Sequence, residues 1–188
     1  MAVLQIRVLG DPVLRVDTTP VTEITSEVRQ LVGDMLETMH AANGIGLAAP
    51  QVGRTERIAV MDIHGEEFVL INPEIVEREG RLNWEEGCLS IPELYGNVVR
   101  AAKVSVQALD REGKPITLEG EELMGVCMQH EIDHLHGKLF IDHLSFLKRQ
   151  KALRQWDDEK DKYPDFIRIV VPGEHEPEDD RAHDDERL

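Results

Sequence analysis

Two histidines and a glutamate lie within five residues at the end of the stretch GVCMQHEIDH, Gly125 to His134. His130, Glu131 and His134 match the pattern H-E-x-x-H. On a helix, side chains four residues apart share one face, so both imidazoles can reach one metal ion. The glutamate then lies beside the metal, where it can take a proton from water and pass it to a leaving group. The stretch predicts metal-dependent hydrolysis, and the alternative is two surface histidines on an ordinary helix.

A third ligand must come from outside this pair, because two imidazoles make only half of a tetrahedral site. The candidates are the other cysteine, histidine and aspartate side chains His136, His143, Asp142, Cys127 and Cys88. Cys127 is seven residues from His134, roughly 10 Å along a helix, so we expect it to pack beside the site. His136 follows His134 by two and points away around the helix. Cys88 lies in the loop-like EEGCLSIPE and can approach from the side, leaving the fourth position open for water.

The composition bounds the class of protein. The chain has 188 residues, of which 41% are apolar, and this predicts one globular domain. A formal net charge of -16 argues against DNA or an anionic membrane as the primary partner. No apolar run approaches the roughly 20 residues that span a bilayer, and MAVLQIRVLG lacks the segments of a signal peptide, so we expect a cytoplasmic protein. Two cysteines exclude a disulfide framework.

The elements that must position the site follow from hydrophobic periodicity. Apolar residues at helical spacing predict a first helix that begins near Thr25 and ends at Asn43-Gly44. GIGLAAPQVG, residues 44–53, is too rich in glycine and proline for regular structure. The strand candidates after it are RIAVMDI, FVLINP, Val98 to Asp110 and Pro115 to Glu119. Helices then follow over about Glu121 to Leu135 and Ser145 to Lys162.

This order of elements predicts an α+β fold. We expect mostly antiparallel β-sheets packed around a central helix that carries H-E-x-x-H, with a C-terminal helix. Residues 1–163 form the expected catalytic domain. Residues 164–188 form an acidic C-terminal extension, which we expect to be disordered from about residue 174 because it holds many charges and almost nothing apolar.

Three stretches together resemble the bacterial-type peptide deformylase family: GIGLAAPQVG (44–53), EEGCLSIPE (85–93) and QHEIDHLHG (129–137). They occur in that family's order and separations, and the resemblance extends over about residues 1–150. It implies that Cys88, His130 and His134 hold one divalent metal ion and that Glu131 is the general acid and base. The oxyanion site implied by the resemblance consists of the Gln51 side chain and the backbone N–H of Leu89.

The resemblance also implies the substrate contacts and the reaction. Gly46 aligns the substrate backbone, and the methionine slot is lined by Ile45, Leu123, Val126 and Cys127. The reaction is removal of the formyl group from the N-terminal formylmethionine of newly made chains. Tyr95 departs from the family pattern, because some members carry at this position an arginine that contacts the substrate backbone. The resemblance therefore does not predict which residues after the methionine this chain prefers.

The metal and a further partner follow from the same resemblance. The family's metal is usually ferrous iron, with zinc, nickel or cobalt as substitutes, whereas ligand chemistry alone predicts zinc. The basic stretch LKRQKALRQW, residues 147–156, could contact the ribosome near the tunnel exit, and a solvated helix face is the alternative.

Two other classes of protein remain open from the residues alone. A zincin-type metallopeptidase shares H-E-x-x-H but takes its third ligand from further along the chain. A metal-stabilised module without activity needs a fourth protein ligand. We also expect Arg100 to pair with Asp133 or Glu86.

Overall fold

The computed structural model describes residues 2–171, so the disorder predicted from about residue 174 concerns residues outside this range. The helices are α1 (Ser26–Ala41), α2 (Glu122–Leu135), α3 (Phe146–Glu159) and the 3-10 turns η1 (Pro12–Arg15), η2 (Ala49–Val52), η3 (Phe140–His143), η4 (Lys160–Lys162) and η5 (Pro164–Phe166). The strands are β1 (Ile6–Arg7), β2 (Gly46–Ala48), β3 (Ile58–Ile63), β4 (Glu66–Glu79), β5 (Leu82–Cys88), β6 (Ile91–Arg100), β7 (Lys103–Leu109), β8 (Pro115–Glu121) and β9 (Ile167–Arg168).

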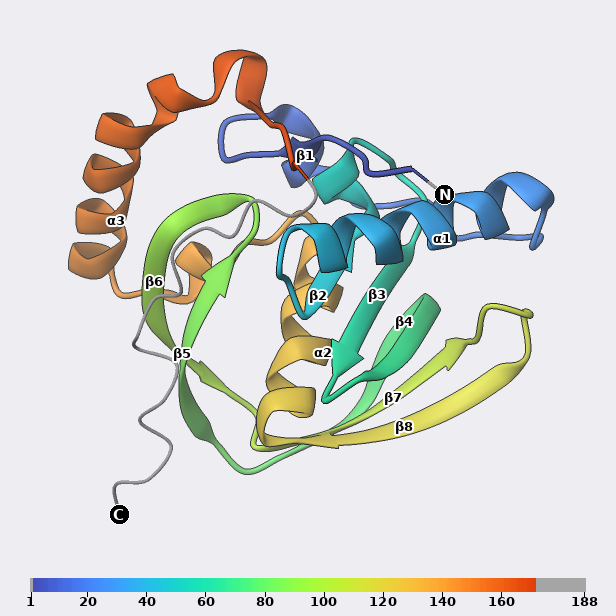
Figure 1. Cartoon of the computed structure of the whole chain (residues 1–188). Helices are drawn as coiled ribbons and strands as arrows, with labels where there is room; N and C mark the ends of the chain where they lie inside the picture. The colour runs from blue at the N-terminus through green and yellow to red at the C-terminus, as the bar shows by residue number, and fades with distance from the viewer. Residues whose placement is uncertain (1, 172–188) are drawn as a thin grey trace.

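The described residues form three antiparallel sheets, two of which lie on either side of one helix (Figure 1). The largest has the strand order β2-β3-β4-β7-β8, and β5-β6 and β1-β9 form two smaller sheets. Figure 1 shows α2 in the middle of the molecule, between the five-stranded sheet and the β5-β6 hairpin. The predicted α+β class, with antiparallel sheets around the motif helix and a helix near the C-terminus, is confirmed.

Helix α1 covers the β2 and β3 end of the large sheet (Figure 1). It begins where the Thr25 side chain accepts a hydrogen bond of 3.3 Å from the backbone N–H of Val28. The buried residues follow the helical period and include Leu31, Met35 and Met39. The helix ends at Ala41, two residues before the predicted Asn43-Gly44 signal.

Helix α2 is buried along most of its length, from Gly125 to Leu135, because sheets lie on both of its sides. The side chain of Gln129 clamps it to the β6–β7 connection, with hydrogen bonds of 3.0 Å to both the backbone N–H and the carbonyl of Ala101. A helix held this way can present fixed side chains to a site between the two sheets.

Three sequence predictions about local structure were wrong. GIGLAAPQVG is regular, because β2 within it pairs along the edge of β3 and η2 follows directly. Cys88 is the last residue of a strand, β5, and does not lie in an irregular stretch. The expected strand from Val98 to Asp110 is broken at Ala101-Ala102, where the chain leaves the β5-β6 sheet and enters the five-stranded one.

The chain beyond α3 returns to the N-terminal strand. In β9, Arg168 is the register partner of Ile6, and the Phe166 carbonyl accepts a hydrogen bond of 2.9 Å from the N–H of Val8. The last predicted helix ends at Glu159 and continues only as the 3-10 turn η4. None of the helices in residues 2–171 is long and apolar enough to cross a bilayer.

Candidate active site

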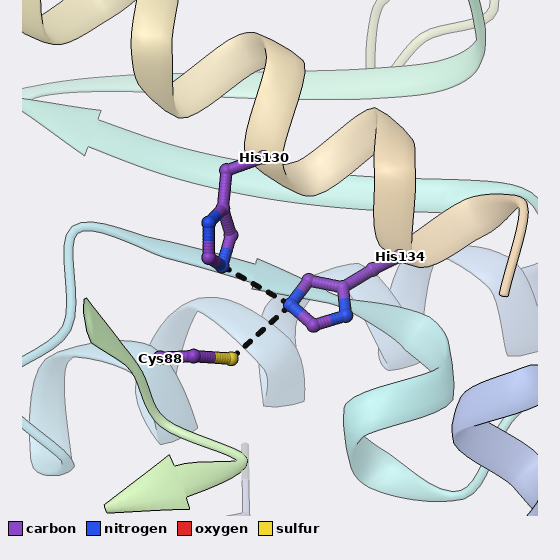
Figure 2. Close-up of side chains that lie close together, drawn as sticks. All are labelled: Cys88, His130 and His134. Carbon is purple, nitrogen blue, oxygen red and sulfur yellow. Dashed lines mark hydrogen bonds between the residues drawn. The ribbon is translucent and has the colours of Figure 1, made fainter. Parts of the chain in front are cut away.

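Helix α2 and the end of β5 bring Cys88, His130 and His134 together (Figure 2). The Cys88 Sγ lies 3.3 Å from His134 Nε2, which lies 3.2 Å from His130 Nε2. All three donor atoms fall within 4.8 Å of one another, and no other group of this kind occurs in the described part of the chain. A thiolate and two imidazoles that converge in this way can hold a divalent metal ion. Burial lowers the pKa of His134, which favours the neutral form that ligates metals.

Glu86 fixes the orientation of His130. The carboxylate lies 2.9 Å from His130 Nδ1, which leaves Nε2 directed toward Cys88 and His134. Arg100 in turn holds Glu86 through two hydrogen bonds of 2.7 and 2.9 Å. Burial raises the pKa of Glu86, but the hydrogen bonds from Arg100 and His130 outweigh it and the pKa is lowered. The glutamate therefore stays ionised beside the site.

Arg100 also joins the far end of the motif to this network. Its Nη1 donates a hydrogen bond of 2.5 Å to Asp133, which lies 2.6 Å from His143 Nε2. Burial raises the pKa of Asp133, but these partners lower it to about 2. The expected pairing of Arg100 with Asp133 or Glu86 is confirmed for both carboxylates.

Glu131 is buried beside the three donor atoms without joining their group. Its Oε2 has no hydrogen-bond partner among the described residues. Burial is the largest cause of a pKa raised to about 7, so either protonation state is accessible near neutral pH. Gly46 packs directly on this carboxylate: a Cβ there would lie 2.3 Å from Glu131 Oε1. Only glycine fits at that position without displacing Glu131.

Gln51 is buried with its amide nitrogen directed toward Cys88. Its Oε1 accepts a hydrogen bond of 2.8 Å from the Ala48 N–H, which fixes the amide orientation. Its Nε2 donates to Ser90 Oγ at 3.2 Å and to Cys88 Sγ at 3.6 Å. Leu89 directly follows Cys88 and lines the same cleft.

A cleft of about 710 Å³ opens onto these groups. The four residues predicted for the methionine slot all line it: Ile45, Leu123, Val126 and Cys127. The Cys127 thiol lies 3.7 Å from the Ile45 carbonyl, and burial raises its pKa well above the usual range. Neither Cys127 nor His136 belongs to the group of three donors.

Known proteins are similar to this chain in sequence and in structure. The family model described as polypeptide deformylase matches residues 3–150. The peptide deformylase of Alkalilimnicola ehrlichii is 54% identical over an alignment of 159 residues that covers 82% of this chain and 89% of that protein. The peptide deformylase of Hydrogenovibrio crunogenus is 50% identical and matches 83% of this chain and 94% of that protein. The chain belongs to the polypeptide deformylase family.

Solved deformylase structures agree with this membership. The crystal structure of the Legionella pneumophila peptide deformylase has a TM-score of 0.83 and 49% identity, covering 86% of this chain and 97% of that one. The Ehrlichia chaffeensis enzyme in complex with actinonin has a TM-score of 0.80 and 38% identity, covering 85% and 99%. The zincin alternative loses its support, because in this deformylase the cysteine that joins the histidine pair precedes H-E-x-x-H and comes from a strand.

Sequence reasoning missed three side chains of the deformylase site. Glu86 was expected only as a partner of Arg100, although its spacing of two from Cys88 would place both on one face of a strand. Ser90, which holds Gln51, and Arg168, which lines the cleft, carry no local signal. Ser90 is near Cys88 in the chain, but its role depends on contact with the distant Gln51, and Arg168 reaches the cleft only through the pairing of β9 with β1.

Proposed function

We propose that Cys88, His130, His134, Glu131 and Gln51 carry out the deformylation of N-formylmethionyl peptides. The chain is a hydrolase that removes the N-formyl group from newly made polypeptides and releases formate. The observation that carries the assignment of roles is the convergence of the three donor atoms at the cleft that Glu131 also lines, with the buried Glu131 Oε2 left without a hydrogen-bond partner among the described residues.

The donor set fits a divalent metal ion, because the three side chains offer two imidazole nitrogens and one sulfur in a buried group whose His130 is oriented from behind by Glu86. When bound, such an ion acts as a Lewis acid that polarises the formyl carbonyl and makes water a nucleophile near neutral pH. We assign ferrous iron on the family resemblance, with zinc, nickel or cobalt as substitutes. Elemental analysis of protein purified without air tests this, and zinc without iron would overturn it.

Glu131 moves the proton. Its carboxylate takes a proton from the attacking water, and the oxygen adds to the formyl carbon. When the carbon–nitrogen bond breaks, Glu131 returns that proton to the departing amine. A pKa of about 7 suits a group that must accept and then donate near neutral pH.

The developing negative charge on the formyl oxygen needs donors that are already in place. The Gln51 amide is fixed by Ala48 and Ser90 and points toward Cys88, so its N–H can donate without reorganising. The N–H of Leu89, next to Cys88 in the chain, is the second donor. Gly46 lets the substrate backbone come close, and the methionine side chain packs among Ile45, Leu123, Val126 and Cys127.

We expect an N-formylmethionyl peptide to react at least ~100-fold faster than its N-acetyl counterpart, a difference of about 2.7 kcal/mol in barrier. The extra methyl group would have to fit beside Gly46, which is already in contact with Glu131 and Cys127. The measurement is formate or acetate release by ferrous-loaded protein in the absence of air. Similar rates for the two peptides would contradict the proposed reaction.

We further propose a cytoplasmic enzyme that meets its substrates at the ribosome. Helix α3 presents the exposed side chains of Phe146 and Leu147 next to the basic stretch LKRQKALRQW, in an otherwise acidic protein. Apolar and basic groups together suit a surface that contacts RNA and protein. Cosedimentation with ribosomes, lost when Lys148 and Lys151 become glutamate, tests this partner.

A further inference from the structure

The sheet β1-β9 carries an arginine into the substrate cleft from outside the matched family region. Arg168 lies in β9, beyond residue 150, where the family match ends. It lines the cleft, and its Nη1 donates a hydrogen bond of 3.4 Å to the Leu89 carbonyl. Main-chain pairing with Ile6 places Arg168 independently of that contact.

The segment that carries Arg168 is well anchored. The Phe166 ring packs on Gly10, where a Cβ would lie 2.3 Å from the ring and where the positive φ of 118° itself favours glycine. The neighbouring Leu9 N–H donates to the Ser90 carbonyl at 2.8 Å. The turn that follows Cys88 and the strand that carries Arg168 therefore rest on the same N-terminal segment.

Arg168 comes to the cleft from β9, whereas three of the four methionine-slot residues come from α2. The slot residues Leu123, Val126 and Cys127 are on α2. Arg168 instead contacts Leu89, whose side chain packs against Gly44 at the end of the loop after α1. A peptide whose methionine occupies the α2 side must continue through the rest of the cleft, where Leu89 and Arg168 form one wall.

Arg168 differs in charge from the acidic side chains that line the cleft. Among the described residues that line it, Arg168 is the one arginine or lysine, whereas Glu85 and Glu93 are both acidic. A formylated substrate has lost its N-terminal positive charge. Without Arg168, no arginine or lysine among the described lining residues would face a substrate carboxylate, and a guanidinium is the side chain best suited to bind one.

We propose that Arg168 is a specificity-determining residue that binds a substrate carboxylate downstream of the formylmethionine. The carboxylate is an aspartate or glutamate side chain, or the C-terminus of a short peptide. The inference rests on the proposed deformylation and extends it to the residues that follow the methionine.

The test compares formate release from formyl-Met-Ala-Ala amide, formyl-Met-Ala-Asp amide, formyl-Met-Asp-Ala amide and uncapped formyl-Met-Ala-Ala. We expect Arg168→Ala to raise KM about fivefold for peptides that carry the bound carboxylate, the effect of a part-exposed ion pair of roughly 1 kcal/mol. KM for the neutral amide should change by less than about twofold, and kcat should stay the same. The capped aspartate peptides report on a side-chain carboxylate, and the uncapped peptide reports on a terminal one.

Two further variants separate charge from structure. Arg168→Lys keeps the positive charge and should recover part of the preference. Arg7→Ala removes one positive charge from the same two-stranded sheet but lies outside the cleft, so all four KM values should match the wild type. Thermal unfolding checks that each variant keeps its fold.

The outcomes are distinguishable from failure of the proposed reaction. Formate release by the wild type from any of the four peptides tests deformylation, and only the ratios between peptides test Arg168. An equal fall in kcat for all four would show that Arg168 merely holds Leu89, and unchanged KM values would show that it binds no carboxylate. Either result would overturn the inference.

Discussion

The variant Glu131→Gln is expected to lower turnover about 10³-fold, within the range that general acid–base catalysis contributes, while metal content stays near one ion per chain. The substitution keeps the shape of the side chain in a pocket where Gly46 leaves no spare room. It removes the group that accepts a proton from water and returns it to the amine. Because an amide cannot carry that proton, both halves of the reaction slow down.

Metal analysis and formate release on the same preparation test this expectation. Glu122→Gln is the matched control, since it makes the same chemical change on the exposed first turn of α2 and should leave both measurements unchanged. Loss of the metal from Glu131→Gln would mean that this carboxylate is a ligand. Normal turnover would mean that another residue moves the proton.

Substitution of the two cysteines is expected to have different effects on metal binding and activity. Cys88→Ala deletes one of the three donors and leaves only His130 and His134, so the metal should dissociate and activity should vanish. Cys127→Ala should keep the metal, because its buried, protonated thiol lies outside the donor group. The loss of a small buried contact beside the methionine slot should cost about 1 kcal/mol in stability or substrate binding.

Elemental analysis of both purified variants separates these outcomes, with circular dichroism as the check that each is folded. A metal-free Cys127→Ala together with a metal-loaded Cys88→Ala would show that the third ligand is misplaced. The family's reaction would then need a different site in this chain.

Elements of the fold could be predicted where a short stretch of sequence carries the signal for them. The faces of α1 and α2 could be predicted because helical periodicity marks them, and H-E-x-x-H fixes its own geometry once the helix is known. The break at Ala101-Ala102 could not be predicted, since no glycine or proline marks it and only the change of sheet divides the run. The regular structure of β2 also had no local signal, because pairing with β3 overrides the preferences of glycine and proline.

The residues of the site also differ in whether a local sequence signal could predict them. The metal donors and Glu131 could be predicted from a motif and a family resemblance. The residues that hold these side chains in place could not, because they meet only through contacts between distant segments. Glu86 and Arg100 lie on the paired strands β5 and β6 but are not register partners, and their side chains meet each other and His130 only in the folded chain. No single stretch of residues encodes that arrangement.

The pairing of β1 with β9 also joins two segments that lie far apart in the chain. Ile6 and its register partner Arg168 are roughly 160 residues apart in the chain, so neither strand can form this sheet from nearby sequence. Closing so long a loop is entropically unfavourable and comes after local elements have formed. The donor triad comes from β5 and α2, which are nearer in the chain, whereas the wall of the cleft that carries Arg168 depends on the long-range pairing. Weakening the contact between β1 and β9 is therefore expected to disturb the Arg168 wall of the cleft before it disturbs the three metal donors.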